Sequence, residues 1–121
     1  MSNITPQLTK ASDDIDRDGW TVVWGPMVNG DVGIGATLVA HADRSFQFEG
    51  TFGAGGAVLV EGSNDLANWR TLNDPQGTPL SITSPAIKQI TEVVRSIRPR
   101  IVAGDGTTEI TVSCLFRRAL R

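Results

Sequence analysis

Residues 45–52 read SFQFEGTF and give the clearest structural signal in the sequence. Phe46, Phe48 and Phe52 fall on one side of an extended chain, and the odd-numbered positions between them are polar. This alternation predicts a strand with one face in a hydrophobic core. The glycine-rich stretch GAGG at 53–56 ends the pattern, and AVLVEGS at 57–63 predicts the next strand.

The same two-residue period recurs on both sides of this stretch. Trp20, Val22 and Trp24 share one face of a predicted strand that Gly25-Pro26 should end. Pro99 predicts a sheet edge or a bulge at 95–102. The last predicted strand, 107–117, turns Ile110, Val112, Cys114 and Phe116 inward, and weaker strand patterns cover 36–41, 69–72, 80–83 and 86–94.

About eight short strands at spacings of roughly 8–12 residues are typical of a sandwich or barrel. No window of eleven or more residues carries a convincing helical stripe. We therefore predict an all-β fold, a two-sheet β-sandwich of jelly-roll type with its core between the sheets.

The length of 121 residues fits one domain. Residues 1–18 are polar and lack a sustained period, so we predict an extended N-terminal arm at 1–18 and a β-sandwich domain at 19–121. No apolar run approaches the ~20 residues that span a bilayer, and the N-terminus does not resemble a secretion signal. A single cysteine excludes an internal disulfide, which is compatible with assembly in a bacterial cytoplasm.

Charge is distributed unevenly along the chain. Residues 95–121 carry six arginines and two acidic residues, whereas the rest carries five basic and eleven acidic residues, giving the net charge of −2. These charges are either solvated strand faces or an interface in which arginines meet an acidic partner or the acidic arm of another copy. Nucleic acid fits poorly, because the pI is about 5.2 and no aromatic residues interleave with the arginines. The candidate interface residues are Asp13, Asp14, Asp16, Asp18, Arg95, Arg98, Arg100, Arg117, Arg118 and Arg121.

Few residues offer catalytic chemistry. His41 is the only histidine, and Cys114 falls on the inward face of the last predicted strand, where a thiol behaves as a small hydrophobic group. A nucleophile–histidine site is therefore hard to build, although paired carboxylates stay open as an alternative. We predict a protein that is not an enzyme, with no catalytic residues, no cofactor and no small-molecule substrate.

Two sequence patterns resemble binding sites, for calcium and for sugars, but each can also be explained without a ligand. Asp14, Asp16 and Asp18, followed by Gly19, match the start of a calcium loop, but position twelve is Gly25 instead of glutamate. A solvated acidic arm explains them better, and we predict no metal site. Trp20 and Trp24 could stack on sugars, but Val22 between them favours a place in the core.

The segment VEGSNDLANWRTL at 60–72 resembles a hairpin phrase of discoidin-like β-sandwich modules. In that phrase Gly62 and Asn64-Asp65 would form the turn and Trp69 would cap the core. Leu66 replaces the usual glycine, so the turn could differ. Residues 58–118 as a whole, from VLVEGSNDLANW to ITVSCLFRR, are similar to small virion proteins of tailed phages.

This second resemblance implies a structural virion protein, namely a head decoration or cement protein that stabilises the capsid. Its expected partners are copies of itself, as a trimer, and the major capsid protein, with no nucleic acid and no membrane. Its expected location is the surface of the phage head, after assembly in the host cytoplasm. The alternative is a carbohydrate-binding or host-attachment module of a tail or fibre, which predicts exposed tryptophans.

Overall fold

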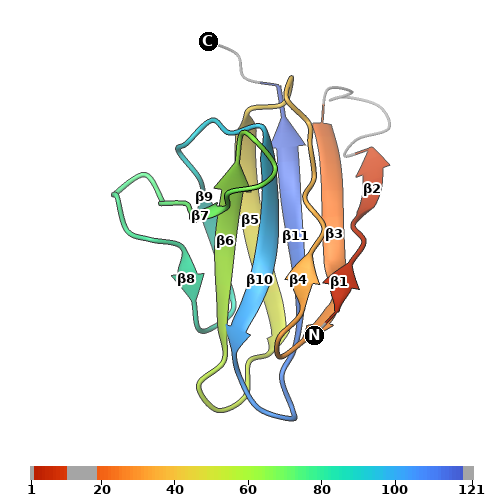
Figure 1. Ribbon diagram of the computed structural model, residues 1–121, viewed down its shortest axis with the longest axis vertical. Helices are drawn as coiled ribbons and strands as arrows, with labels where there is room; N and C mark the ends of the chain where they lie inside the picture. The colour runs from red at the N-terminus through yellow and green to blue at the C-terminus, as the bar shows by residue number, and fades with distance from the viewer. Residues whose placement is uncertain (1, 11–18, 119–121) are drawn as a thin grey trace.

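The computed structural model describes residues 2–10 and 19–118. Their secondary structure consists of strands and turns without helix, so the all-β prediction is confirmed. Two sheets pack face to face as a β-sandwich (Figure 1). The described residues contain no helix that is long and apolar enough to cross a membrane.

The six-stranded sheet has the order β1-β4-β10-β6-β7, and β8 also pairs with β6. Its strands are β1 (Asn3–Ile4), β4 (Val32–Gly33), β6 (Ala57–Ser63), β7 (Arg70–Thr71), β8 (Ser81–Ile82) and β10 (Ser96–Ala103). The five-stranded sheet has the order β2-β3-β11-β5-β9. Its strands are β2 (Gln7–Lys10), β3 (Gly19–Val28), β5 (Asp43–Thr51), β9 (Ala86–Gln89) and β11 (Glu109–Arg117).

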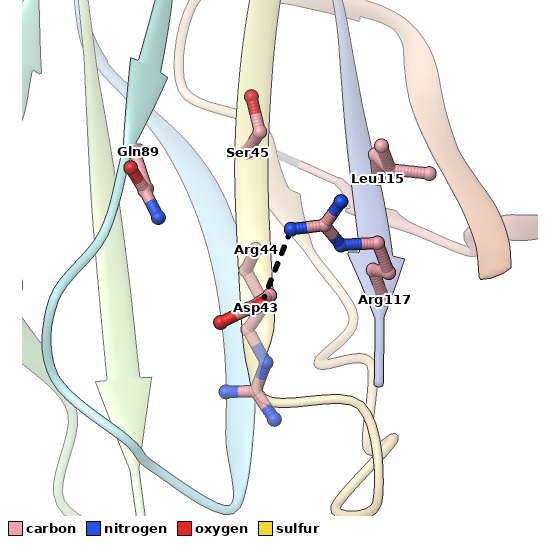
Figure 2. Close-up of a pocket in the computed structure, with 6 residues that line it drawn as sticks. All are labelled: Asp43, Arg44, Ser45, Gln89, Leu115 and Arg117. Carbon is pink, nitrogen blue, oxygen red and sulfur yellow. Dashed lines mark hydrogen bonds and ion pairs between the residues drawn. The ribbon is translucent and has the colours of Figure 1, made fainter. Parts of the chain in front are cut away.

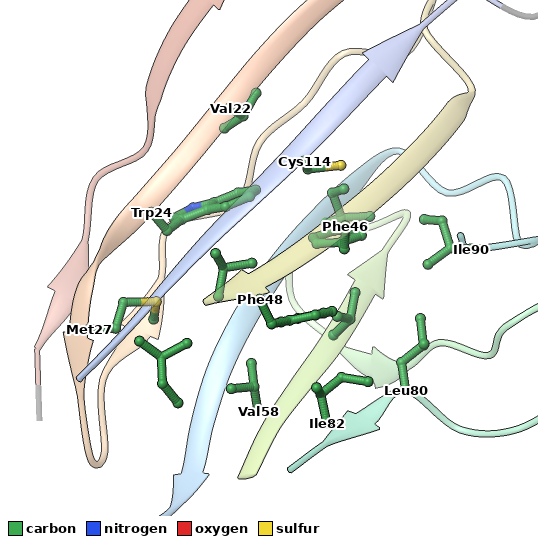
Figure 3. Close-up of a cluster of buried hydrophobic side chains, with 14 of the residues drawn as sticks. Val22, Trp24, Met27, Phe46, Phe48, Val58, Leu80, Ile82, Ile90 and Cys114 are labelled. Carbon is green, nitrogen blue, oxygen red and sulfur yellow. The ribbon is translucent and has the colours of Figure 1, made fainter. Parts of the chain in front are cut away.

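The core lies between the sheets and contains the residues that the two-residue period predicted (Figure 3). Phe46, Phe48 and Phe52 are all buried, and the Trp24 and Phe46 rings stack at 6.3 Å between centroids. The indole nitrogen of Trp24 donates a hydrogen bond to the carbonyl of Ile34 at 2.8 Å, so this core tryptophan leaves no polar atom unpaired.

The N-terminal segment belongs to both sheets. Residues 3–4 (β1) pair in parallel with β4, and residues 7–10 (β2) pair antiparallel with β3. The predicted arm at 1–18 is therefore part of the sandwich over its described residues, because backbone pairing holds it against the same chain. This pairing was missed because the segment carries too few apolar residues for a visible period.

Strand β3 continues through Gly25-Pro26, where we expected the strand with Trp20, Val22 and Trp24 to end. Trp24 pairs with Val112 and Met27 pairs with Ile110, so Gly25 and Pro26 face the single residue between them on β11 as a bulge. Gly25 has φ of 131°, a conformation that glycine adopts most readily.

The predicted strand at 36–41 is absent, and only Ala36 forms a bridge, with Ile97. The guanidinium of Arg44 takes the carbonyls of Leu38 and His41 as acceptors, so the backbone here bonds to a side chain instead of a neighbouring strand.

Pro99 does not mark an edge, because β10 lies between β4 and β6. The amides of Ile97 and Ile101 point toward the β4 side, so the nitrogen of Pro99 faces the same way. There β4 is two residues long, and a Cβ on Gly33 would lie 2.7 Å from Pro99 Cδ. The missing side chain of Gly33 makes room for the proline ring inside the sheet.

Candidate interaction surfaces

Two arginines lie side by side on the outer face of the six-stranded sheet and share one carboxylate. Arg98 of β10 is paired in register with Glu61 of β6, and its Nε lies 3.0 Å from Glu61 Oε1. A guanidinium nitrogen of Arg100 lies 3.6 Å from Glu61 Oε2. Glu61 is only 6% exposed, whereas the Arg100 side chain is 46% exposed. One buried carboxylate therefore orients two guanidinium groups and leaves a net charge of +1.

Trp69 supports this arrangement. The guanidinium carbon of Arg98 lies 4.2 Å from the centre of the Trp69 ring, which is cation–π geometry. The ring also lies so close to Gly35 that a Cβ there would be 2.7 Å from the Trp69 Cη2 atom. Trp69 is half-buried and lies outside the core cluster, so it packs on Arg98 instead of capping the core as predicted. We call Glu61, Trp69, Arg98 and Arg100 the arginine surface.

The hairpin loop beside Trp69 is held by Asp65. Its carboxylate accepts hydrogen bonds from the Asn68 amide and side chain, the Ala67 amide and the Ser63 hydroxyl, which keep the pKa of Asp65 well below its usual range. Leu66 has φ of 62°. This is the left-handed conformation that glycine adopts most readily, and here leucine adopts it in place of the usual glycine of the phrase.

A small hollow lies on the outer face of the five-stranded sheet (Figure 2). Its volume is about 260 Å³, and its lining includes Asp43, Ser45, Gln89, Leu115 and Arg117. A guanidinium nitrogen of Arg117 lies 3.4 Å from Asp43 Oδ2, so the hollow has one ion pair beside an amide and a hydroxyl. Such a mixture of donors and acceptors can bind a polar ligand.

Arg44, which also lines the hollow, is a buried cation that we did not predict as a site residue. It is 1% exposed, and it donates to the carbonyls of His41, Val94 and Leu38 at 3.1, 2.7 and 3.3 Å. Burial lowers the pKa of this guanidinium. The alternation along β5 could have predicted this burial, because Arg44 is two residues before Phe46 and so lies on the same inward face of the strand.

The five-stranded sheet carries two exposed carboxylates on its outer face, near the end of β5 and the start of β11. Thr111 pairs with Glu49 and Thr51 pairs with Glu109, so these two acidic residues are diagonal neighbours on β5 and β11. Gln47 donates a hydrogen bond to Glu49 at 3.0 Å. Within residues 2–10 and 19–118 neither carboxylate forms an ion pair. We call Glu49 and Glu109 the acidic pair.

The structure divides the arginines that the sequence grouped together. Arg98 and Arg100 face out from the six-stranded sheet, Arg117 faces out from the other sheet, and Arg95 lies in the loop before β10. Arg118 follows β11 and is exposed. They therefore do not form one continuous face. Asp13, Asp14, Asp16, Asp18 and Arg121 lie outside the described residues, so the predicted pairing with the acidic arm and the calcium pattern lie outside them too.

The other residues considered for catalysis or binding lie in the core, against it or in a loop. Cys114 is buried in the core, and burial raises the pKa of its thiol far above the usual range. Trp24 is fully buried and Trp20 packs partly against the core, as the core interpretation predicted. His41 lies in the loop before β5, and its buried Nδ1 has no hydrogen-bond partner. No group of three or more potential metal ligands occurs among the described residues.

Comparison with protein-family models and with curated proteins finds no match. Among solved structures, the chain is similar to the SPBc2 prophage-derived protein YomS, with a TM-score of 0.62 and 7% identity. The similarity covers 86% of this chain and 98% of that one. An iron(II) form of HppE matches with a TM-score of 0.38 and 10% identity over 92% of this chain and 56% of that one, which is too weak to carry an argument. The chain therefore shares its β-sandwich fold with a prophage-derived protein.

Proposed function

We propose that this chain is a structural protein of a tailed-phage particle and works through contacts with other proteins. The observation that carries the proposal is the arginine surface, where a buried carboxylate and a tryptophan hold two arginines in place on an open sheet face. Arginine and tryptophan are enriched at the energetic centres of protein interfaces. Groups that are oriented before binding lose less entropy on association.

The phage assignment has two supports. Residues 58–118 resemble small virion proteins, and the fold is shared with a prophage-derived protein over nearly the whole of that chain. The finer proposal is a decoration or cement protein on the head, bound to the major capsid protein and to copies of itself as a trimer. In this role the domain presents a rigid surface and carries out no catalytic step.

Co-sedimentation tests this function. The tagged chain is produced in cells that make the particles encoded by its own genome, and the particles are separated on a density gradient. The chain should sediment with intact heads, and the double variant Arg98→Ser and Arg100→Ser should remain at the top of the gradient. If the native chain and the double variant both sediment with heads to the same extent, the arginine surface has no role in binding. If neither protein is found with particles, the virion role is refuted.

The hollow beside Asp43 and Arg117 favours a second candidate function, host attachment through glycans. Carboxylate, guanidinium, amide and hydroxyl groups converge there next to the apolar side chain of Leu115. A glycan array probed with the chain and with Asp43→Ala would test it. Binding that is lost in the variant would favour attachment, whereas an array without signal would remove this candidate.

A further inference from the structure

We propose that copies of this chain associate head to tail, with the arginine surface of one copy against the acidic pair of the next. The inference deepens the proposed function, because it assigns the partner surface for self-association. It rests on the outer faces of the two sheets, which point in opposite directions (Figure 1) and carry the oppositely charged arginine surface and acidic pair.

The two faces have complementary charges. The arginine surface has a net charge of +1, and both of its guanidinium groups keep nitrogens that are not engaged by Glu61. The acidic pair has a charge of −2 and no ion-pair partner among the described residues. Opposite potentials across an interface set the register and suppress other pairings.

The spacing of the charges also matches. Arg98 and Arg100 are two positions apart on β10, which separates their Cα atoms by about 7 Å. Glu49 and Glu109 are diagonal neighbours on adjacent strands, a separation of about 7–8 Å. Each guanidinium can therefore meet one carboxylate in a single docking position, and bidentate geometry would fix the orientation.

The receiving face supplies most of the area that an interface needs. Between β3, β11 and β5 its outward positions include small polar residues such as Thr21, Thr111 and Ser113. Strands β3, β5 and β11 have nine or ten residues each and β2 and β9 have four each, so with about 4.8 Å between strands and a rise of about 3.3 Å per residue the sheet covers roughly 570 Å². A stable interface needs about 800 Å² on each partner, so the whole sheet face and the loops beside it would take part.

A symmetric pairing is disfavoured by the same charges. Two arginine surfaces placed together would oppose like charges, and so would two acidic pairs. The contact therefore joins different faces, and one copy can bind a neighbour on each side. Such a contact repeats along an open chain of copies and so replaces the closed trimer of the finer proposal above. The native mass should therefore rise in steps with protein concentration instead of stopping at three copies.

Single charge reversals test this arrangement, with native mass measured by light scattering and sedimentation. At about 50 mM salt, Arg100→Glu and Glu109→Arg should each weaken self-association about tenfold or more, and about 500 mM salt should weaken the unmodified chain. Lys88→Glu is the matched control. It makes the same charge change as Arg100→Glu on edge strand β9, where the register with Phe46 places Lys88 off both faces, so self-association should be unchanged.

Mixing two neutralised variants gives the decisive result. Arg100→Ser keeps the acidic pair and Glu109→Gln keeps the arginine surface, so one intact contact forms between them, no reversed ion pair restores the other contact, and the mixture should stop at a 1:1 dimer. Thermal unfolding confirms that each variant folds, and Arg100→Ser replaces Arg100→Glu if that variant unfolds. A monomeric native chain, a mixture without dimer, or equal weakening by Lys88→Glu would overturn the proposal.

The outcome is separate from the particle test. A monomeric chain that still sediments with heads would overturn head-to-tail association and leave the proposed function standing. A self-associating chain that never sediments with particles would overturn the proposed function and leave head-to-tail association standing.

Discussion

Gly33→Ala should destabilise the fold although it adds a single methyl group. The new Cβ would lie 2.7 Å from Pro99 Cδ and 2.8 Å from Trp24 Cδ1, and neither rigid ring can turn away. Gly33 has no left-handed φ, so the cost is steric and not conformational. Overpacking of this kind costs about 1–3 kcal/mol. A loss of about 2 kcal/mol would lower Tm by roughly 5–10 °C in a domain of this size.

Thermal and urea unfolding measure this effect against two further variants. Gly106→Ala adds the same methyl group where no atom lies within 4 Å, so its unfolding free energy should change by less than about 0.5 kcal/mol. Pro99→Ala in the Gly33→Ala background removes the closest ring atoms, so the double variant should lose less than the sum of the singles. Equal stability of Gly33→Ala and Gly106→Ala would refute the packing of Pro99 against Gly33.

Three other measurements examine charged and reactive groups. Hydrogen bonds from the Thr107 side chain and the Ala54 amide lower the pKa of Asp105 to about 2. The ionised Asp105 carboxylate therefore stabilises the folded state fully above its unfolded-state pKa of about 3.9, and this stabilisation is lost as the pH falls toward 2. The Tm difference between the native chain and Asp105→Asn should therefore be constant above about pH 5 and shrink below about pH 4. Cys114 should react with a thiol reagent only at the rate of global unfolding, and fast labelling of the native protein would contradict its burial. Glu61→Gln should lower the free energy of unfolding, measured in urea, by about 1–3 kcal/mol, because two guanidinium groups lose their charged acceptor. An unchanged urea midpoint would mean that water replaces the Glu61 carboxylate as acceptor.

Alternation along the chain was enough to predict the sandwich and most of its core. The strand at 57–63 was predicted with its observed bounds, and the inward sets of β5 and β11 are buried as expected. These elements have one face in the core, which imposes a two-residue period on the sequence. The short strands β1 and β4 have two residues each, too few for any period to appear.

The interaction surfaces could be predicted only in part. Sequence composition identified Arg98 and Arg100, but the partnership with Glu61 and Trp69 depends on the pairing of β10 with β6, across more than 30 residues of chain. The acidic pair was not predicted at all, because Glu49 and Glu109 become neighbours only through the register of β5 and β11. Surface groups of this kind leave no local pattern, since solvent-facing positions accept many residue types.

The order of strands in the sheets has a consequence for synthesis on the ribosome. Residues 96–117 supply β10 and β11, and each of these strands lies inside its sheet with a neighbour on both sides. Until they leave the ribosomal exit tunnel, β3 and β5 have no strand between them, and β4 and β6 are separated in the same way. Until residues 96–117 emerge, the nascent chain should therefore expose open strand edges, and both sheets are completed only through contacts that are distant in sequence. Chaperones that bind extended apolar segments would meet this chain during that interval.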